Sequence, residues 1–122
     1  MNFSKFLRSF TIGFLGLSHI IRSEQNMRLH CCAAIGVIIA GFVFSLAAWE
    51  WVVILFCLGL VISAECLNKA VERLADRVTR EQDPLIKQAK DCGSAAVLVV
   101  AITAAAVGGV IFLPKIWALA GR

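Results

Sequence analysis

The sequence predicts an all-α integral membrane protein with one interfacial helix and three membrane-spanning helices. Of its 122 residues, 60% are hydrophobic and only 16% are charged, and the mean hydropathy is +0.85. A soluble globular domain is far less apolar than this. The charged residues are also clustered, which leaves three apolar runs close to the ~20 residues that a helix needs to cross a membrane. A β-barrel does not fit, because the runs do not alternate polar with apolar residues and three strands cannot close a barrel.

Residues 1–28 predict an amphipathic helix that lies in the membrane interface. Apolar side chains recur there at intervals of three and four residues: Phe3, Phe6, Leu7, Phe10, Phe14, Leu17 and Ile21. They form one helical face, and basic residues beside it can reach anionic headgroups. A cleaved signal peptide is the alternative, since TIGFLGLSHII resembles a short apolar core, but no A-x-A-like site follows before the basic stretch.

The three membrane helices are placed by the gaps between charged residues. The run between His30 and Glu50 predicts a helix over about 29–49, and the run from Trp51 predicts one over about 51–71. The run between Asp91 and Lys115 predicts a third over about 92–113. Residues 72–91 are then a loop, and we expect the whole chain, 1–122, to form a single domain.

The distribution of basic residues predicts the orientation in the membrane. Four precede the first span, six surround the connection between the second and third spans, and two lie on the other side. The positive-inside rule places the N-terminus and the 72–91 loop in the cytoplasm and the C-terminus outside. We expect the positive charge to face lipid headgroups, and no nucleic acid among the partners.

The stretch SAECLNKAVERLAD, residues 63–76, places polar groups on one helical face where the second span ends. Their spacing is that of a helix: Glu65, Asn68, Lys69, Glu72 and Asp76. Counted from Trp51, Glu65 lies about 21 Å into a hydrocarbon layer of about 30 Å. A carboxylate at that depth indicates function, and partial desolvation suits it to act as a general base. The alternative is that these are surface charges on a helix leaving the membrane, some paired with Arg73 or Arg77.

Other charged residues at the same interface complete a site for phosphoryl transfer. Glu72 lies closer to water than Glu65, and with Glu24 it could hold a magnesium ion whose other ligands are waters and phosphates. Lys87 and Lys90 precede the third span, and the expected start of that helix near Asp91 would expose N–H groups to an anion. These features predict phosphate transfer to an acceptor at the membrane surface. The chain has no GxxxxGK[ST] or GxGxxG motif, so a nucleotide is held without a standard phosphate loop.

The sequence resembles the small prokaryotic diacylglycerol kinase and undecaprenol kinase family. The segment ECLNKAVERLAD is close to the family signature E-x-[hydrophobic]-N-[ST]-[SA]-[hydrophobic]-E-x-x-V-D, and QAKDCGSAAVL is similar to a second family segment. The resemblance implies a homotrimeric, three-span lipid kinase of the bacterial plasma membrane. It also implies that the enzyme uses ATP and Mg²⁺ to phosphorylate a membrane lipid alcohol.

The resemblance also implies roles for individual residues. Glu65 takes the proton of the lipid hydroxyl, and Glu24 and Glu72 hold magnesium together with the ATP phosphates. Contacts to the nucleotide or the reacting groups fall to Lys5, Asn68, Lys90, Asp91 and Ser94. Four positions depart from the family pattern: Lys69 replaces Ser or Thr, Ala75 replaces Val, Lys5 replaces Arg and Ile12 replaces an aromatic residue.

Different segments of the sequence resemble different branches of the family, and these branches use different acceptor lipids. EQNMRLH, the pair Glu50–Trp51 and DPLIKQAKD resemble the undecaprenol kinase branch, whereas GSAAVL resembles the diacylglycerol kinases. Undecaprenol is therefore the favoured acceptor and diacylglycerol the alternative. Two other classes stay open from the residues alone, namely a proton-coupled transporter and a structural membrane protein. The five cysteines lack C-x-x-C spacing, so we expect buried free thiols and no zinc site.

Overall fold

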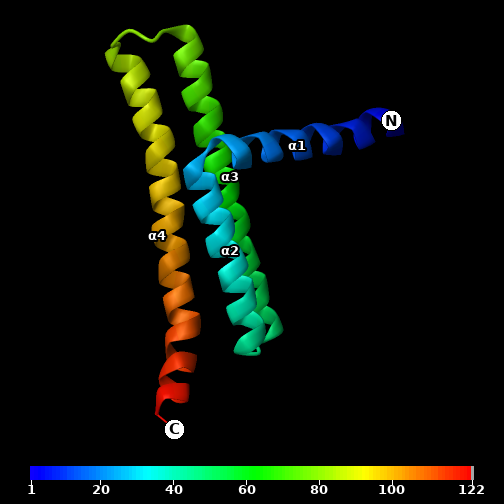
Figure 1. Ribbon diagram of the computed structural model, residues 1–122, viewed down its shortest axis with the longest axis vertical. Helices are drawn as coiled ribbons and strands as arrows, with labels where there is room; N and C mark the ends of the chain where they lie inside the picture. Colours follow the sequence, from blue (N-terminus) through cyan, green and yellow to red (C-terminus); the bar gives the residue numbers. More distant parts are fainter. Residues whose placement is uncertain (122) are drawn as a thin grey trace.

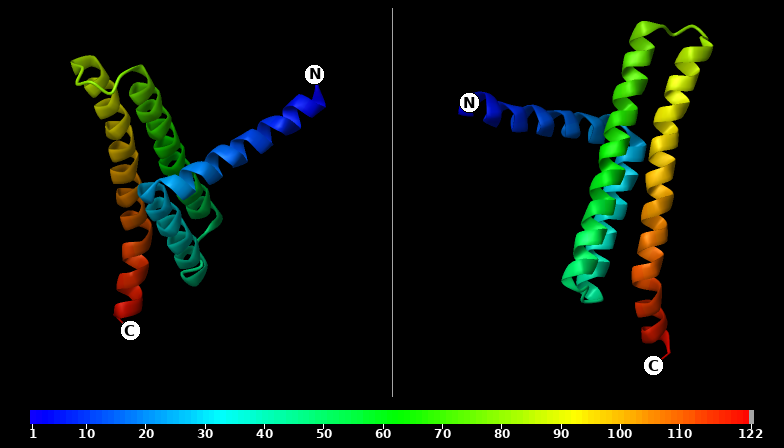
Figure 2. Two further views of the ribbon diagram at one scale, coloured as in Figure 1. Left: turned by 45° about the horizontal axis from the view of Figure 1, so that its top comes forward. Right: turned by 180° about the vertical axis from the view of Figure 1, so that it is seen from behind.

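The protein is a bundle of three long helices from which a fourth projects sideways, as a computed structural model describes it for residues 1–121 (Figure 1). The helices are α1 (Phe3–Ser23), α2 (Gln25–Val43), α3 (Ala48–Val78) and α4 (Pro84–Ala120). The last three run side by side, and α1 leaves them where α2 begins (Figure 2). Each of the three is long and apolar enough to cross a membrane, so the predicted fold class is confirmed.

Two of these helices are longer than the spans predicted over 51–71 and 92–113. Helix α3 has 31 residues and α4 has 37, which makes them about 46 and 55 Å long at 1.5 Å per residue. Both therefore extend beyond a hydrocarbon layer of about 30 Å. Residues 72–91, expected to be a loop, are helical except for residues 79–83. The charged end of the molecule is thus mostly a helical extension of the bundle.

Helix α4 begins early because its sequence carries a strong start signal. The Asp83 Oδ1 accepts hydrogen bonds from the N–H groups of Leu85 and Ile86 at 2.8 and 3.2 Å. Pro84 occupies the first helical position, where its missing N–H is not needed and its fixed φ suits a helix. The gaps between charged residues predicted that the helix starts at 92, whereas this cap starts it at 84.

The bundle is held together at the end remote from α1 by an apolar cluster and one ion pair. Leu46, Ile54 and Ile111 form the buried cluster. Glu50, at the start of α3, accepts the N–H of Ala47 at 3.0 Å and the ammonium of Lys115 at 3.2 Å. Helix α4 continues through Pro114 to reach this contact.

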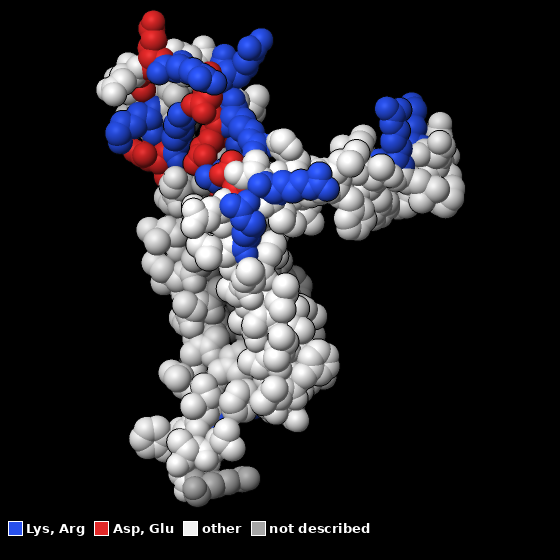
Figure 3. Space-filling view, viewed as in Figure 1, with Lys and Arg blue, Asp and Glu red and all other residues white. Residues whose placement is uncertain are grey.

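Charged side chains gather at the opposite end, around the α3–α4 connection and the root of α1 (Figure 3). The body of the bundle below them shows almost no charge on the face drawn. Helix α1 buries none of its residues, and its large apolar side chains are exposed, among them Phe3, Phe6, Phe10 and Phe14. Its apolar face is therefore not covered by the rest of the chain.

The α2–α3 hairpin is closed by a close approach between Gly41 and Trp51. A Cβ built on Gly41 would lie 2.5 Å from the Trp51 ring, which packs at a tilt against Phe42 with ring centroids 4.9 Å apart. The turn between the helices contains Ser45 in the left-handed region, at φ 53°. The contact fixes how α2 lies on α3 and therefore the level at which the two helices present their polar ends.

Replacing Gly41 and Gly36 by alanine tests this packing. Gly36→Ala meets no atom within 4 Å, so it should raise the free energy of unfolding by up to about 1 kcal/mol through helix propensity. Gly41→Ala must displace the Trp51 ring and should lower it by roughly 1–3 kcal/mol. Unfolding in mixed detergent micelles measures both values, and equal effects of the two substitutions would contradict the packing described.

Candidate active site

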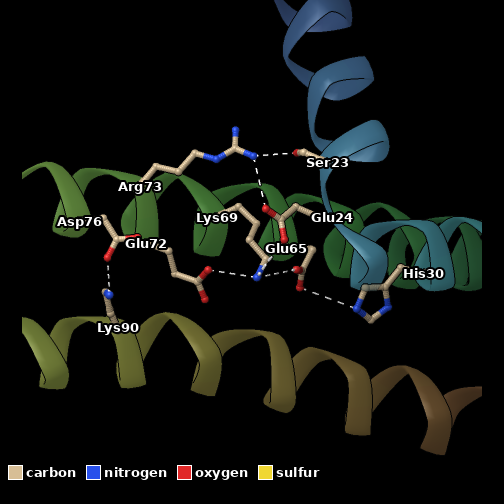
Figure 4. A network of polar contacts seen from close by, with 9 residues as sticks. All are labelled: Ser23, Glu24, His30, Glu65, Lys69, Glu72, Arg73, Asp76 and Lys90. Carbon is tan, nitrogen blue, oxygen red and sulfur yellow. Dashed lines mark hydrogen bonds and ion pairs between the residues drawn. The ribbon is translucent and has the colours of Figure 1, made fainter. Parts of the chain in front are cut away.

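The polar face predicted on residues 65–76 lies between the α1–α2 junction and α4 (Figure 4). Glu65, Asn68 and Lys69 are buried, with 1%, 6% and 9% of their surface exposed. The expected difference between the two glutamates is present, since the side chain of Glu65 is 2% exposed and that of Glu72 is 32% exposed. The surface-charge alternative therefore does not describe the inner half of this face.

Lys69 lies at the centre of three carboxylates. Its Nζ donates a hydrogen bond to Glu72 Oε2 at 3.0 Å and lies 3.6 Å from Glu24 Oε2 and 3.8 Å from Glu65 Oε1. Two of these partners follow from helical spacing, at i−4 and i+3. The sequence thus contained a signal for this cluster, because Lys69 lies on the predicted polar face, although no role was assigned to it there.

Glu24 joins the cluster because the chain breaks between α1 and α2 at this residue. Its extended backbone, φ −119° and ψ 118°, ends α1 and starts α2. Arg28 folds back and donates to the last carbonyls of α1, those of Ile21 and Arg22, at 3.1 and 2.8 Å, which satisfies helix-end acceptors with a cation. The break thereby turns the Glu24 carboxylate toward α3.

Arg73 fastens this junction to α3 from the outer side. Its guanidinium donates to the Ser23 hydroxyl oxygen at 2.8 Å and to Glu24 Oε1 at 3.4 Å. Arg73 is exposed and Lys69 is buried, so Glu24 is held between an outer and an inner cation. The position of α1 relative to the bundle is consequently coupled to the geometry of the site.

His30 lies beside the buried glutamate, which sequence reasoning did not anticipate. Its Nε2 is 3.8 Å from Glu65 Oε2. Counting back from the hairpin turn would have revealed it, because His30 is 13 residues before the end of α2 and Glu65 is 17 residues after the start of α3. These positions differ in depth by about one helical turn.

Asn68 faces Gly93 of α4 at a close approach of the two helices. A Cβ built on Gly93 would lie 2.5 Å from Asn68 Oδ1, so a larger residue at 93 would displace the amide. Asn68 Oδ1 and Glu65 Oε1 are both buried and accept no hydrogen bond. Buried polar atoms are normally paired, so these two acceptors in one site are able to take hydrogen bonds from a polar ligand.

The other expected site residues lie further toward the charged end. Lys90 contacts Asp76 at 2.5 Å, linking α4 to α3, and Lys87 contacts Asp91 at 2.7 Å along α4. The hydrogen bond from Lys90 holds the pKa of Asp76 below its usual value, and the hydrogen bond to Asp91 raises the pKa of Lys87. Asp76 therefore pairs with Lys90 rather than with the arginines expected from α3.

The structure places Asp91 and Lys5 differently from what the sequence predicted. Asp91 lies inside α4, which begins at Pro84, so the expected free N–H groups near residues 91–93 are wrong; the helix start is capped by Asp83 instead. Lys5 is in the first turn of α1, the end that projects away from the bundle (Figure 1). Within one chain it is not brought to the carboxylate cluster. Ser94 is exposed on α4, one residue beyond Gly93.

The carboxylates fit a magnesium ion of the kind that also takes phosphate ligands. Glu24 and Glu72 converge on one cationic atom, Lys69 Nζ, so they can share a cation. Among residues 1–121, no group of three or more His, Cys, Asp or Glu side chains is arranged to hold a metal. Magnesium commonly uses one or two carboxylates together with waters and substrate phosphates, so the pair is sufficient.

Three membrane-length helices with a buried acid–lysine cluster at one end define a small multi-pass membrane protein with a candidate active site beside its apolar surface. Residues 11–112 match the family described as prokaryotic diacylglycerol kinase. The chain belongs to this family. The expectation of a lipid kinase is thereby confirmed at the level of the family, over the transporter and structural alternatives.

Individual relatives are similar over most of the chain. The undecaprenol kinase of Bacillus subtilis is 38% identical over 113 residues, which cover 93% of this chain and 92% of the relative. The diacylglycerol kinase of a Synechocystis species is 36% identical, covering 93% of this chain and 65% of the relative. The diacylglycerol kinase of Haemophilus influenzae is 33% identical, covering 80% and 83%.

The Asp76–Lys90 contact predicts a measurable titration. Because the pKa of Asp76 is lowered, the contact stabilises the folded state above the pKa of an unfolded aspartate and is lost as the pH falls through the lowered value. Lys90→Gln should return the pKa of Asp76 toward its usual value. The carboxyl ¹³C chemical shift of Asp76 in detergent micelles measures this, with Arg77→Gln as the control that leaves it low. Identical titration in wild type and Lys90→Gln would contradict the contact.

Proposed function

We propose that the protein transfers the γ-phosphoryl group of ATP to the primary hydroxyl of a membrane lipid, at the charged end of the bundle. The observation that carries this proposal is the position of Glu65. It is a buried carboxylate at the level where apolar helix surface gives way to the charged end, with Lys69 on one side and His30 on the other. A lipid presents its first polar group at that level.

The chemistry assigned to Glu65 is that of a general base. Its Oε1 accepts no hydrogen bond within the chain, so it is free to accept one from the lipid hydroxyl. As the proton moves to Glu65, the hydroxyl oxygen bonds to the γ-phosphorus and the bond from that phosphorus to the β–γ bridging oxygen breaks, releasing ADP. Asn68, with its own unpaired Oδ1, orients the reacting groups beside it.

Magnesium would be held by Glu24 and Glu72. When bound with ATP, it neutralises charge that develops on the β- and γ-phosphates. Glu24 and Glu72 have more exposed side chains than Glu65, and this difference fits a division of roles. Glu72 is close to water and suits a hydrated cation, whereas Glu65 lies in the dry part of the site and suits proton transfer.

The nucleotide would lie toward the charged end, against Lys90, Asp91 and Ser94 on α4. In the free protein Lys90 and Asp91 are occupied by Asp76 and Lys87, and these exposed pairs can open to contact phosphate and ribose. Lys5 would contribute only from another chain or after a movement of α1. This requirement supports the homotrimer that the family resemblance implies, with active sites shared between subunits.

The acceptor would enter from the membrane side along an apolar hollow. This hollow of about 260 Å³ is bordered by His30 at the site end and continues past Ala34, Ile54 and Gly108 to Phe112. Its walls suit hydrocarbon, and its position would present a hydroxyl to Glu65. We favour undecaprenol because of the relative named undecaprenol kinase, with diacylglycerol as the alternative supported by the others.

The proposed setting is the bacterial plasma membrane, with the charged end in the cytoplasm. The clustering of basic side chains at that end supports this orientation through the positive-inside rule (Figure 3). ATP is then available to the site. Helix α1, whose apolar face the rest of the chain leaves uncovered, would lie in the cytoplasmic interface, and the C-terminus would be outside.

Phosphate transfer from labelled ATP tests the proposal. The full chain in detergent micelles with magnesium is offered undecaprenol and diacylglycerol separately, and we expect faster labelling of undecaprenol. Glu65→Gln keeps the shape of the side chain but cannot take a proton, so it should reduce the rate roughly 10²- to 10⁴-fold.

Glu81→Gln provides the matched control, because Glu81 is an exposed glutamate in the α3–α4 connection and its loss should leave the rate unchanged. Labelling of neither lipid by folded wild-type protein would reject the kinase proposal. Full activity of Glu65→Gln would reject the assignment of the base.

A further inference from the structure

Lys69 occupies the point at which the proposed magnesium carboxylates converge. Its ammonium contacts Glu72, Glu24 and Glu65 at 3.0, 3.6 and 3.8 Å (Figure 4). The residue is only 9% exposed, so these contacts are shielded from bulk water. Within residues 1–121, no other lysine meets more than one carboxylate.

The surroundings of the ammonium resemble those of a bound cation more than those of a structural ion pair. Only the contact to Glu72 is a hydrogen bond, while Glu65 Oε1 stays buried and without a hydrogen bond. A structural pair would be expected to satisfy that oxygen. Toward Glu24 and Glu65 the ammonium stands at 3.6 and 3.8 Å, where charge attraction acts without a hydrogen bond.

The three carboxylates require a cation in this position whether or not a nucleotide is bound. Like charges grouped in a partly dry site repel strongly, and each is expensive to bury without a partner. A lysine ammonium is a compact charge on a flexible four-carbon stem, so it can be displaced without moving the helix backbone. The lysine can therefore offset part of the negative charge of the site in the free enzyme and still give way to a metal–nucleotide complex.

We propose that Lys69 is a built-in cation that holds the place of the divalent ion in the free enzyme and turns to the nucleotide phosphates when the metal–nucleotide complex enters. This inference rests on the proposed function for the placement of the metal between Glu24 and Glu72. Its consequence is an order of binding: the free enzyme excludes a divalent ion on its own, and the ion enters with the nucleotide. Lys69 is thus a positioning residue of the metal site.

Binding of Mn²⁺, followed by electron paramagnetic resonance without nucleotide, tests this inference on the full chain in detergent micelles. The wild type should bind Mn²⁺ weakly. Lys69→Met keeps the length of the side chain and removes its charge, so it should bind Mn²⁺ at least about tenfold more tightly. Lys69→Arg keeps the charge and should behave as the wild type does. Arg80→Met, which removes an exposed basic residue of the α3–α4 connection, should also leave binding unchanged.

A second substitution locates the ion. Adding Glu72→Gln to Lys69→Met should return Mn²⁺ binding to the weak wild-type level, and thermal unfolding checks that each variant is folded. Tight binding by the wild type without nucleotide would overturn the inference and needs no variant. Equal binding by Lys69→Met and wild type, or tight binding that survives Glu72→Gln, would also overturn it.

The same preparations separate this inference from the proposed function. Wild-type protein that phosphorylates neither lipid would reject the kinase proposal, whereas tighter Mn²⁺ binding by Lys69→Met would still establish that the lysine competes with a metal ion. Conversely, an active kinase whose Lys69→Met variant binds Mn²⁺ no better than wild type would reject only the role given to Lys69.

Discussion

The ammonium of Lys69 joins parts of the chain that lie far apart in the sequence. Through Glu24 it holds the α1–α2 junction against α3, and through Glu65 and Glu72 it fixes two glutamates a full two turns apart on one face. The buried cluster around Ile54 cannot supply this, because it lies at the other end of the bundle. Ion pairs therefore position the helices at the polar end, and apolar packing positions them at the other end.

This arrangement explains how a chain with so little buried surface can carry an active site. In the lipid-facing bundle, close approaches at Gly41 and Gly93 set the relative levels of the helices. Those levels bring His30 and Asn68 to the depth of Glu65. Beyond the apolar region α3 and α4 continue as one rigid pair, joined by Lys90 and Asp76. A lipid can thus approach from the membrane side and a phosphate donor from the charged side.

The fold class and the polar face on residues 65–76 could be predicted from the sequence, because composition and helical periodicity determine them directly. The helix ends could not be predicted from hydropathy, which reports depth in a membrane; the cap at Asp83 and Pro84 decides where α4 begins. The contact of Glu24 with Lys69 depends on a break between α1 and α2 at Glu24, which the pattern of charged residues placed after residue 28. Asp91 was wrongly expected at a helix start because hydropathy does not reveal the cap at Asp83. The contact of His30 with Glu65 was missed because the two residues lie on different helices, on either side of the α2–α3 hairpin turn.

The most direct test of the central role of Lys69 is a double-mutant cycle between Glu24→Gln and Lys69→Met, read as free energy of unfolding in mixed detergent micelles. The cycle isolates the interaction between the two side chains from the effect of each alone. We predict a coupling of at least about 1 kcal/mol, as for residues of one ion-pair network. Additive effects, within about 0.3–0.5 kcal/mol, would contradict the account, because the α1–α2 junction would then be held to α3 without Lys69.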